Sequence, residues 1–241
     1  MATGPQREYL GRAPMPAGAR AAEIDVGLRA YMQKVFGLMA GGTAVTGLVS
    51  YFGAASGLYL QIAQTPLIWV VVFAPLAFAF FFGMRINAMR ASTAQALFWV
   101  FSALMGLSLS YIFLRYTETS IARTFFIAAA TFAGMALYGY TTKRDLSAIG
   151  SFLIMGLFGL IIAMVINIFL QSSALSFAVS AIGVLIFSGL TAYDTQKIKE
   201  MYFEGDATDV AGRKAIMGAL TLYLDFINLF MFLLQFMGDR R

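Results

Sequence analysis

Seven long apolar stretches follow one another along most of the chain, separated by short polar connections. They lie at residues 35–52, 66–84, 94–114, 121–140, 149–170, 172–193 and 215–237. Each has the length of a helix that crosses a bilayer, about 17–25 residues. Their apolar residues run on without the alternation of polar and apolar positions that is typical of a β-barrel. The pattern therefore predicts an all-α multi-pass membrane protein with seven transmembrane helices.

The connections between these stretches differ in length and composition. Residues 1–30 hold three prolines and several glycines, which disfavour regular structure, so we expect a flexible tail before a seven-helix domain at 31–241. The last part of that segment, residues 21–34, is expected to form a short interfacial helix. No apolar core of a cleaved signal peptide begins within it. The link around Ser172 is so short that the fifth and sixth helices should form a tight antiparallel hairpin.

Composition supports the membrane assignment and removes several kinds of chemistry. The 241 residues are 60% hydrophobic and 12% charged, whereas soluble domains are about 45–50% apolar and about 25% charged. The absence of Cys excludes disulfides, thiolate metal sites and thiol nucleophiles. The absence of His removes the usual general base, zinc ligand and pH switch. Any proton sensing near neutral pH therefore falls to carboxyl groups.

Lysine and arginine predict the orientation of the helices. One set of connections holds thirteen of them, at positions 7, 12, 20, 29, 34, 85, 90, 143, 144, 197, 199, 213 and 214, and the other set holds only Arg115, Arg123, Arg240 and Arg241. Because cytoplasmic loops carry the excess of positive charge, the N-terminus is expected in the cytoplasm and the C-terminus outside. No basic run with interleaved aromatic residues indicates a nucleic-acid partner.

Two aspartates lie in or at the edge of apolar helices. Asp194 directly follows the sixth stretch, and Asp225 lies about ten residues after Lys214 and fourteen before Asp239, roughly 15 Å and roughly 20 Å from the two helix ends. A carboxylate at the centre of such a helix costs about 2.5–3.5 kcal/mol on insertion scales, so both acids are functional candidates. The alternatives are an interfacial Asp194 paired with Lys197, and an Asp225 that only locks helices together.

The depths of these two acids argue against direct contact if both helices face lipid. If the seventh helix is central and surrounded by the others, its charged ends do not report its depth, and a pair becomes possible. Two carboxyl groups a few ångströms apart do not readily both ionise, so such a pair would share a proton.

Three further polar residues are weighed beside the acids. Arg85 ends the second helix at a depth comparable to Asp194, where it is either a latch for that aspartate or an ordinary positive anchor. Asn228 lies one turn from Asp225 on the same helical face. Asn167, in the fifth helix, fits an interhelical hydrogen bond better than a ligand role.

Three stretches of sequence resemble a known family. They are residues 138–149, which include Tyr138-Gly-Tyr-Thr-Thr-Lys-Arg-Asp145, then Gly189-Leu-Thr-Ala-Tyr-Asp-Thr-Gln-Lys197, and Gly218-Ala-Leu-Thr-Leu-Tyr-Leu-Asp-Phe-Ile-Asn-Leu-Phe230. From about Tyr31 to its end the chain is similar to the Bax inhibitor family, in particular the bacterial inner-membrane branch. The resemblance implies six helices around a central seventh.

The resemblance also carries roles for individual residues. It implies that Asp194 and Asp225 match the paired aspartates of the family, which sense pH in a calcium leak pathway. It implies further that a basic residue of the second helix latches to the first aspartate, for which Arg85 is the candidate. Some bacterial relatives are linked to the modulation of a membrane-bound protease.

The leading functional prediction is a pH-sensitive cation leak channel of the cytoplasmic membrane, for calcium, without a cofactor and without enzymatic activity. Asp194 and Asp225 would hold Ca²⁺ weakly and transiently, because two carboxylates are few for a site that needs about six to eight oxygens. Weak binding suits conduction. The expected partners are the lipid bilayer, calcium or another cation, and other membrane proteins.

Two alternatives belong to other functional classes. An intramembrane aspartyl protease would also use two aspartates on consecutive helices, and Tyr193-Asp194 fits its first motif. Its second motif, Gly-x-Gly-Asp, is replaced here by Leu222-Tyr-Leu-Asp225, whose bulky side chains would obstruct a substrate backbone. The other alternative is a non-transporting regulator that binds membrane proteins such as a membrane protease.

Overall fold

The computed structural model describes the backbone of residues 17–241 and the side chains from Asp25 onward. Within that range the chain is almost entirely helical. The elements are α1 (Ala17–Ala55), α2 (Leu58–Ala63), α3 (Leu67–Arg85), the 3-10 turn η1 (Ile86–Ala88), α4 (Ala91–Leu109), α5 (Tyr111–Arg115), α6 (Glu118–Thr141), α7 (Ser147–Leu170), α8 (Ser173–Glu200) and α9 (Thr208–Met237). Seven of the described helices are long and apolar enough to cross a membrane, which confirms the prediction of seven transmembrane helices.

The first helix is longer than the sequence pattern predicts. It begins at Ala17 and runs without a break to Ala55, so residues 17–30 are helical and the short helix predicted at 21–34 is part of the first span. Nine of the fourteen residues at 17–30 are Ala, Arg, Glu or Leu, which are strong helix formers and allow the helix to begin before the apolar stretch. The rest of the predicted tail, residues 1–16, lies outside the described residues.

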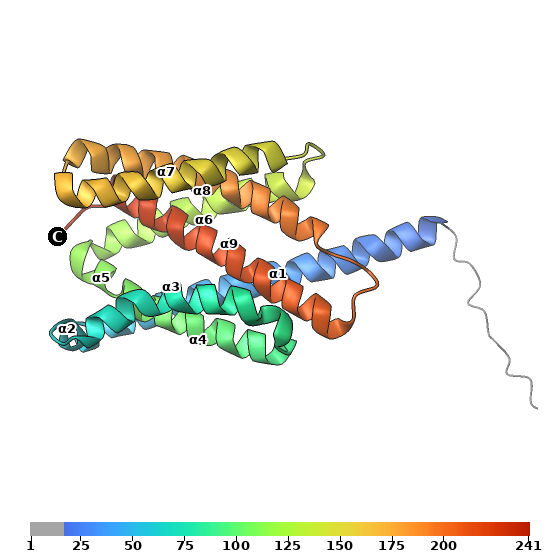
Figure 1. Cartoon of the computed structure of the whole chain (residues 1–241), viewed down its shortest axis with the longest axis horizontal. Helices are drawn as coiled ribbons and strands as arrows, with labels where there is room; N and C mark the ends of the chain where they lie inside the picture. Colours follow the sequence, from blue (N-terminus) through green and yellow to red (C-terminus); the bar gives the residue numbers. More distant parts are fainter. Residues whose placement is uncertain (1–16) are drawn as a thin grey trace, which may run out of the picture.

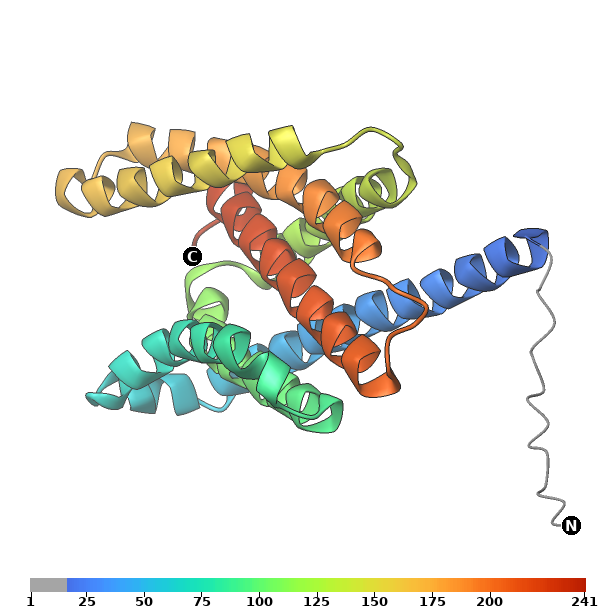
Figure 2. The ribbon, with the colours of Figure 1, turned by 45° about the vertical axis from the view of Figure 1, so that its right-hand side comes forward.

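The last helix, α9, is the centre of the molecule. It is the most buried of the seven spans, and α1, α4, α6 and α8 pack directly against it. The other two spans lie farther out, with α3 packed on α4 and α7 packed on α8. Two groups of three helices therefore flank α9, which Figure 1 shows as the red helix that crosses between α6, α7 and α8 on one side and α1, α3 and α4 on the other. Figure 2 shows the same separation from another angle.

The outer helices turn large apolar side chains away from the protein. Trp69 and Phe80 of α3, and Phe158 and Phe169 of α7, are exposed. In a bilayer such side chains face lipid tails that are as apolar as they are, so their exposure carries no penalty. The exposed surface of these outer helices is therefore apolar, as expected of helices that face lipid.

Small residues allow the helices of each group to approach closely. A Cβ atom on Gly139 of α6 would overlap the carbonyl group of Ala192 in α8, and one on Gly106 of α4 would lie 2.7 Å from the carbonyl oxygen of Thr46 in α1. Close backbone approach at small residues is the usual way in which helices pack in lipid. The contact at Ala192 holds α8 in place only two residues before Asp194.

The rotation of α9 about its axis is fixed by a buried tyrosine. Tyr223 is fully buried, and its hydroxyl lies 2.6 Å from the hydroxyl of Thr46, which also donates a hydrogen bond to the carbonyl oxygen of Ser102. The rings of Phe98 and Phe101 pack edge-on against it. Two residues along a helix correspond to a rotation of about 200°. Asp225 therefore points away from α1 and α4, towards α8.

Candidate functional site

Asp194 and Asp225 lie side by side between α8 and α9. Their carboxyl groups are within hydrogen-bonding reach of each other and line the same cavity. Asp225 is 5% exposed, in the middle of the central helix. Asp194 is half-buried near the end of α8. The two helices cross, so that an acid near the end of one reaches an acid at the middle of the other. The depth argument against a pair is therefore removed.

The two carboxyl groups can form a hydrogen bond only when one of them is protonated. A carboxylate accepts hydrogen bonds but has no proton to donate, so the doubly ionised pair has repulsion and no bond between its members. Asp225 Oδ2 is buried, and no donor of the described residues binds it. The two acids can therefore share one proton between α8 and α9. When that proton is released, the two carboxylates repel each other.

Little positive charge lies near the pair in the described part of the chain. Lys197, one turn after Asp194 on α8, is the cation that acts on it. The ammonium group of Lys197 is exposed and lies 5.7 Å from the centre of the Tyr193 ring. Among the described residues, no group of three or more acidic side chains is placed to hold a metal ion. From Asp25 onward, the structure therefore gives the pair neither the cation of a buried ion pair nor the further carboxylate of a tight metal site.

The cavity at the pair has a volume of about 490 Å³ and lies between α7, α8 and α9. Apart from the two acids its polar lining residues are Thr221 and Asn228, and the rest are apolar. A neighbouring cavity of about 330 Å³ shares Met164, Asn228 and Phe232 with it and ends at Arg115, Gln235 and Arg240. Together the two cavities follow α9 from the pair to the end of the bundle that holds the C-terminus, on the left of Figure 1.

The two predicted asparagines, Asn228 and Asn167, lie in different surroundings. Asn228 lines both cavities, and its amide nitrogen donates to the carbonyl oxygen of Leu224 in its own helix, 2.8 Å away. Asn167 lies at the α7–α8 hairpin, where it donates to Ser176 Oγ at 2.7 Å and accepts from the backbone nitrogen of Ser172. Its hydrogen bonds therefore join the two helices of the hairpin.

Arg85 is the last residue of α3 and is exposed. In the described part of the chain it forms no ion pair with Asp194. Because α3 packs mainly on α4, in the other helix group from α8, the latch would need a different arrangement of the two groups. The latch stays a prediction.

Gln196 is a positioning residue that sequence reasoning missed. Its side chain is buried, accepts from the backbone nitrogen of Leu146 at 2.9 Å and donates to the carbonyl oxygen of Arg144 at 2.8 Å. One turn on, Lys199 donates to the carbonyl oxygen of Tyr140 at 2.8 Å. These bonds tie the end of α8, and with it Asp194, to the α6–α7 connection. The only sequence signal was an amide two residues after the aspartate.

The start of α9 is tied to the other helix group. Asp209 accepts a hydrogen bond from the backbone nitrogen of Ala91, at the start of α4, at 2.8 Å and pairs with Arg213 at 2.6 Å. Arg213 also donates to the carbonyl oxygen of Met89 at 2.9 Å. Asp194 and Asp225 therefore sit on helices whose ends are anchored to different halves of the molecule.

Comparison with known proteins agrees with this architecture. Residues 28–241 match the model of the family described as inhibitor of apoptosis-promoting Bax1. An uncharacterised protein of Rickettsia prowazekii is 51% identical over 219 residues, 90% of this chain and 93% of that protein. An uncharacterised protein of Caulobacter vibrioides is 45% identical, over 94% of this chain and 95% of its own length. The inner membrane protein YbhL of Escherichia coli K12 is 45% identical, over 89% and 94%. The chain belongs to the Bax inhibitor family.

Proposed function

We propose that this protein is a pH-sensitive cation leak channel of the cytoplasmic membrane, that calcium is its ion, and that Asp194 and Asp225 are its sensor. The observation that carries the proposal is the contact of two carboxyl groups at membrane depth, with no Arg or Lys among the described side chains placed to neutralise both. Structural ion pairs need an opposite charge. Two neighbouring acids without an opposite charge can instead work as a sensor that binds and releases a proton.

Protonation of the pair decides whether α8 and α9 stay together. With one proton, a hydrogen bond joins Asp194 to Asp225, and with none, the two charges repel in a medium that screens them poorly. Because Gln196 anchors α8 to the α6–α7 connection and Asp209 anchors α9 to α4, repulsion pushes two halves of the molecule apart. The pair therefore biases an equilibrium between a closed and an open arrangement.

The two adjoining cavities provide the path on the outer side of the sensor. A cation that enters from the C-terminal end, outside the cell in the predicted orientation, passes Gln235 and Asn228 before it meets the acids. Ionised carboxylates and amide oxygens are suitable ligands for Ca²⁺, but fewer than the six to eight it takes in tight sites. Residence is therefore short, as conduction requires. Arg85 would stabilise the arrangement in which it reaches Asp194.

Calcium flux into proteoliposomes tests the proposal. Wild type, Asp194→Asn and Asp225→Asn are reconstituted with an internal calcium dye, and flux is recorded across the neutral pH range. Each Asn variant should lose the pH dependence of wild type, because the remaining carboxyl group has no second acid with which to share a proton or to repel. Glu200→Gln is the matched control, since Glu200 is an exposed acid on the same helix as Asp194. Equal flux and equal pH dependence in all four proteins would falsify the proposal.

The same proposal gives the pair no catalytic role. Proteolysis by two aspartates needs a peptide backbone and a water molecule at the acids. Asp225 is 5% exposed, and the bulky side chains of Leu224 and Leu190 line the cavity beside it. We therefore expect no cleavage of a transmembrane peptide under conditions where flux is measured. Cleavage that either Asp→Asn variant abolishes would contradict this assignment.

A further inference from the structure

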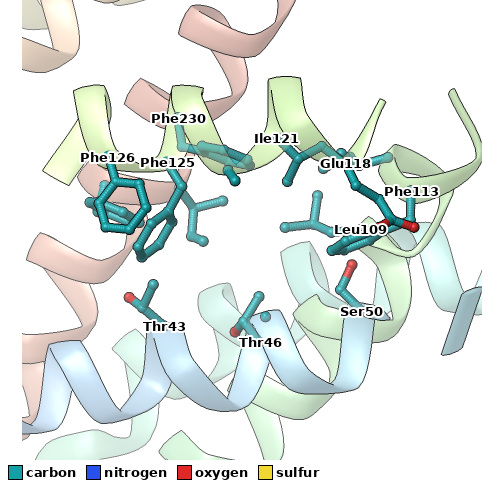
Figure 3. A pocket seen from close by; sticks show the side chains of 15 residues that line it. Thr43, Thr46, Ser50, Leu109, Phe113, Glu118, Ile121, Phe125, Phe126 and Phe230 are labelled. Carbon is teal, nitrogen blue, oxygen red and sulfur yellow. The ribbon is translucent and has the colours of Figure 1, made fainter. Parts of the chain in front are cut away.

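A separate cavity lies on the other side of α9 from the acids. Its volume is about 310 Å³, and it is lined by α1, α6, the end of α4, the short helix α5 and the face of α9 that carries Phe226 and Phe230. At 100° per residue Phe226 and Phe230 lie about 100° and about 140° around the helix from Asp225, and the lining residues of this cavity include none of those that line the cavity at the acids. The cavity is therefore independent of the proposed sensor. Figure 3 shows it with α6 above and α1 below.

The cavity opens sideways to the bilayer. Both α1 and α6 pack on α9, but they pack little on each other, so the space between them is not closed by protein. At one end Figure 3 shows the rings of Phe125, Phe126 and Phe230, and Phe126 is 71% exposed. The lining is almost wholly apolar, and an apolar space of this kind does not hold ordered water. Its natural occupant in a membrane is an acyl chain.

The other end of the cavity is charged. Glu118, the first residue of α6, lines it, and Figure 3 shows the carboxyl group of Glu118 on the same side as Ser50, whose hydroxyl points into the space. A small adjoining cavity of about 150 Å³ shares Phe113 and Glu118 with it and reaches Arg241. The Arg241 guanidinium lies 3.7 Å from Glu118, and both side chains are at least half exposed. The apolar cavity therefore ends at the carboxylate of Glu118 and the guanidinium of Arg241.

We propose that this site binds a phospholipid whose zwitterionic headgroup carries a primary ammonium. Its acyl chain fills the cavity between α1 and α6, its phosphate pairs with Arg241, and its ammonium donates to Glu118. Arginine suits phosphate oxygens, and an ammonium has three donors for a carboxylate. A headgroup with negative charge alone would place that charge beside Glu118. The headgroup lies at the end of the bundle where α6 begins and the chain ends, which is where lipid headgroups meet the helix ends.

Photocrosslinking tests the position of the acyl chain. The probe is phosphatidylethanolamine with a diazirine on one acyl chain, mixed into vesicles of phosphatidylethanolamine and phosphatidylglycerol. We expect labelling of the peptides with Phe125 and Phe126 well above that of α3. Gly47→Leu should reduce it to the level of α3, because Gly47 lines the cavity and a Cβ there meets no other atom within 4 Å. Gly37→Leu is the matched control, with equal space on the same helix but outside the cavity.

A second variant fills the cavity from the other wall. Ala122→Phe, on α6, should reduce the labelling as Gly47→Leu does, and it keeps the test decisive if the α1 variant does not fold. Equal labelling of wild type and the folded filling variants would overturn the acyl-chain site.

The headgroup is tested with the same diazirine chain on phosphatidylglycerol. Wild type should be labelled more by the ethanolamine probe than by the glycerol probe, and Glu118→Gln should remove this preference. Arg241→Gln should lower labelling by both probes, because both carry the phosphate. Equal labelling of wild type by the two probes would overturn the assignment of the headgroup.

Discussion

The hydroxyl groups of Tyr223 and Thr46 lie 2.6 Å apart in the interior of the bundle, on the side of α9 that faces α1. Two residues after Tyr223, Asp225 points to the opposite side, into the cavity it shares with Asp194. One buried hydrogen bond therefore fixes the rotation of the central helix, and the rotation decides where the acid lies.

Tyr223→Phe should destabilise the protein and disturb the sensor. The variant removes one buried hydrogen bond, worth about 0.5–1.5 kcal/mol, and keeps the ring between Phe98 and Phe101. Thr46 keeps its bond to Ser102, so no new unpaired donor arises. We expect a lower unfolding temperature in detergent. Tyr138→Phe, at a tyrosine that is 46% exposed, is the control and should unfold like wild type. Identical unfolding of all three proteins would contradict the role of this contact.

Gln196→Ala should loosen the end of α8 without touching the acids. It leaves the backbone nitrogen of Leu146 and the carbonyl oxygen of Arg144 without partners, at a cost of about 1–3 kcal/mol. Hydrogen exchange at the Leu146 amide should become faster, and the pH dependence of the calcium leak should weaken, because repulsion between the acids then moves α8 without the α6–α7 connection. Glu200→Ala, at an exposed position on the same helix, should change neither. Unchanged exchange in Gln196→Ala would show that the α6–α7 connection does not depend on this side chain.

The seven spans could be predicted from the sequence because each apolar stretch is long enough by itself to identify a transmembrane helix. It also singled out both aspartates, since an acid in such a stretch stands out locally. Their contact could not be derived from depth along each helix, because it depends on the crossing of α8 and α9, and the resemblance to a family supplied the central seventh helix that allows it.

Other features were beyond sequence reasoning for a related reason. Gln196 forms hydrogen bonds with backbone groups about fifty residues earlier in the chain. The sequence around a single polar residue does not indicate such a distant partner. The short helices α2 and α5 are each a turn or two long and have no apolar periodicity of their own. The helical start of α1 lies in a polar region where the proline-rich segment before it suggested a tail.

Arg115 and Arg240 should slow cation entry at the outer mouth of the path. Both line the cavity that leads from the C-terminal end towards Asn228. Replacement of both by Gln removes two repelling charges, and a barrier lowered by about 1 kcal/mol gives roughly fivefold faster calcium flux. Arg123→Gln is the control, because Arg123 lies at the same end but pairs with Asp239 at 3.4 Å and does not line the cavity. Equal flux in the double variant and the control would place the entry elsewhere.

Asp145 provides a pH dependence that is separate from that of the buried pair. The hydroxyl and the backbone N–H of Ser147 hold the pKa of Asp145 below its ordinary value of 3.8. Since the folded pKa is lowered, ionised Asp145 stabilises the folded protein above pH 3.8, and this stabilisation is lost as the pH falls through the lowered pKa. Asp145 lies just before α7, where a negative charge also favours the helix N-terminus.

Asp145→Asn should therefore unfold at a lower temperature than wild type at neutral pH, and the difference should disappear in strong acid. Thermal unfolding of the two proteins at both pH values measures this. The dependence of calcium flux on pH in the neutral range should be the same in both, because Asp145 stays ionised throughout that range. A shift of the flux profile in Asp145→Asn would mean that the exposed carboxylate at the start of α7, and not only the pair between α8 and α9, controls the response to protons.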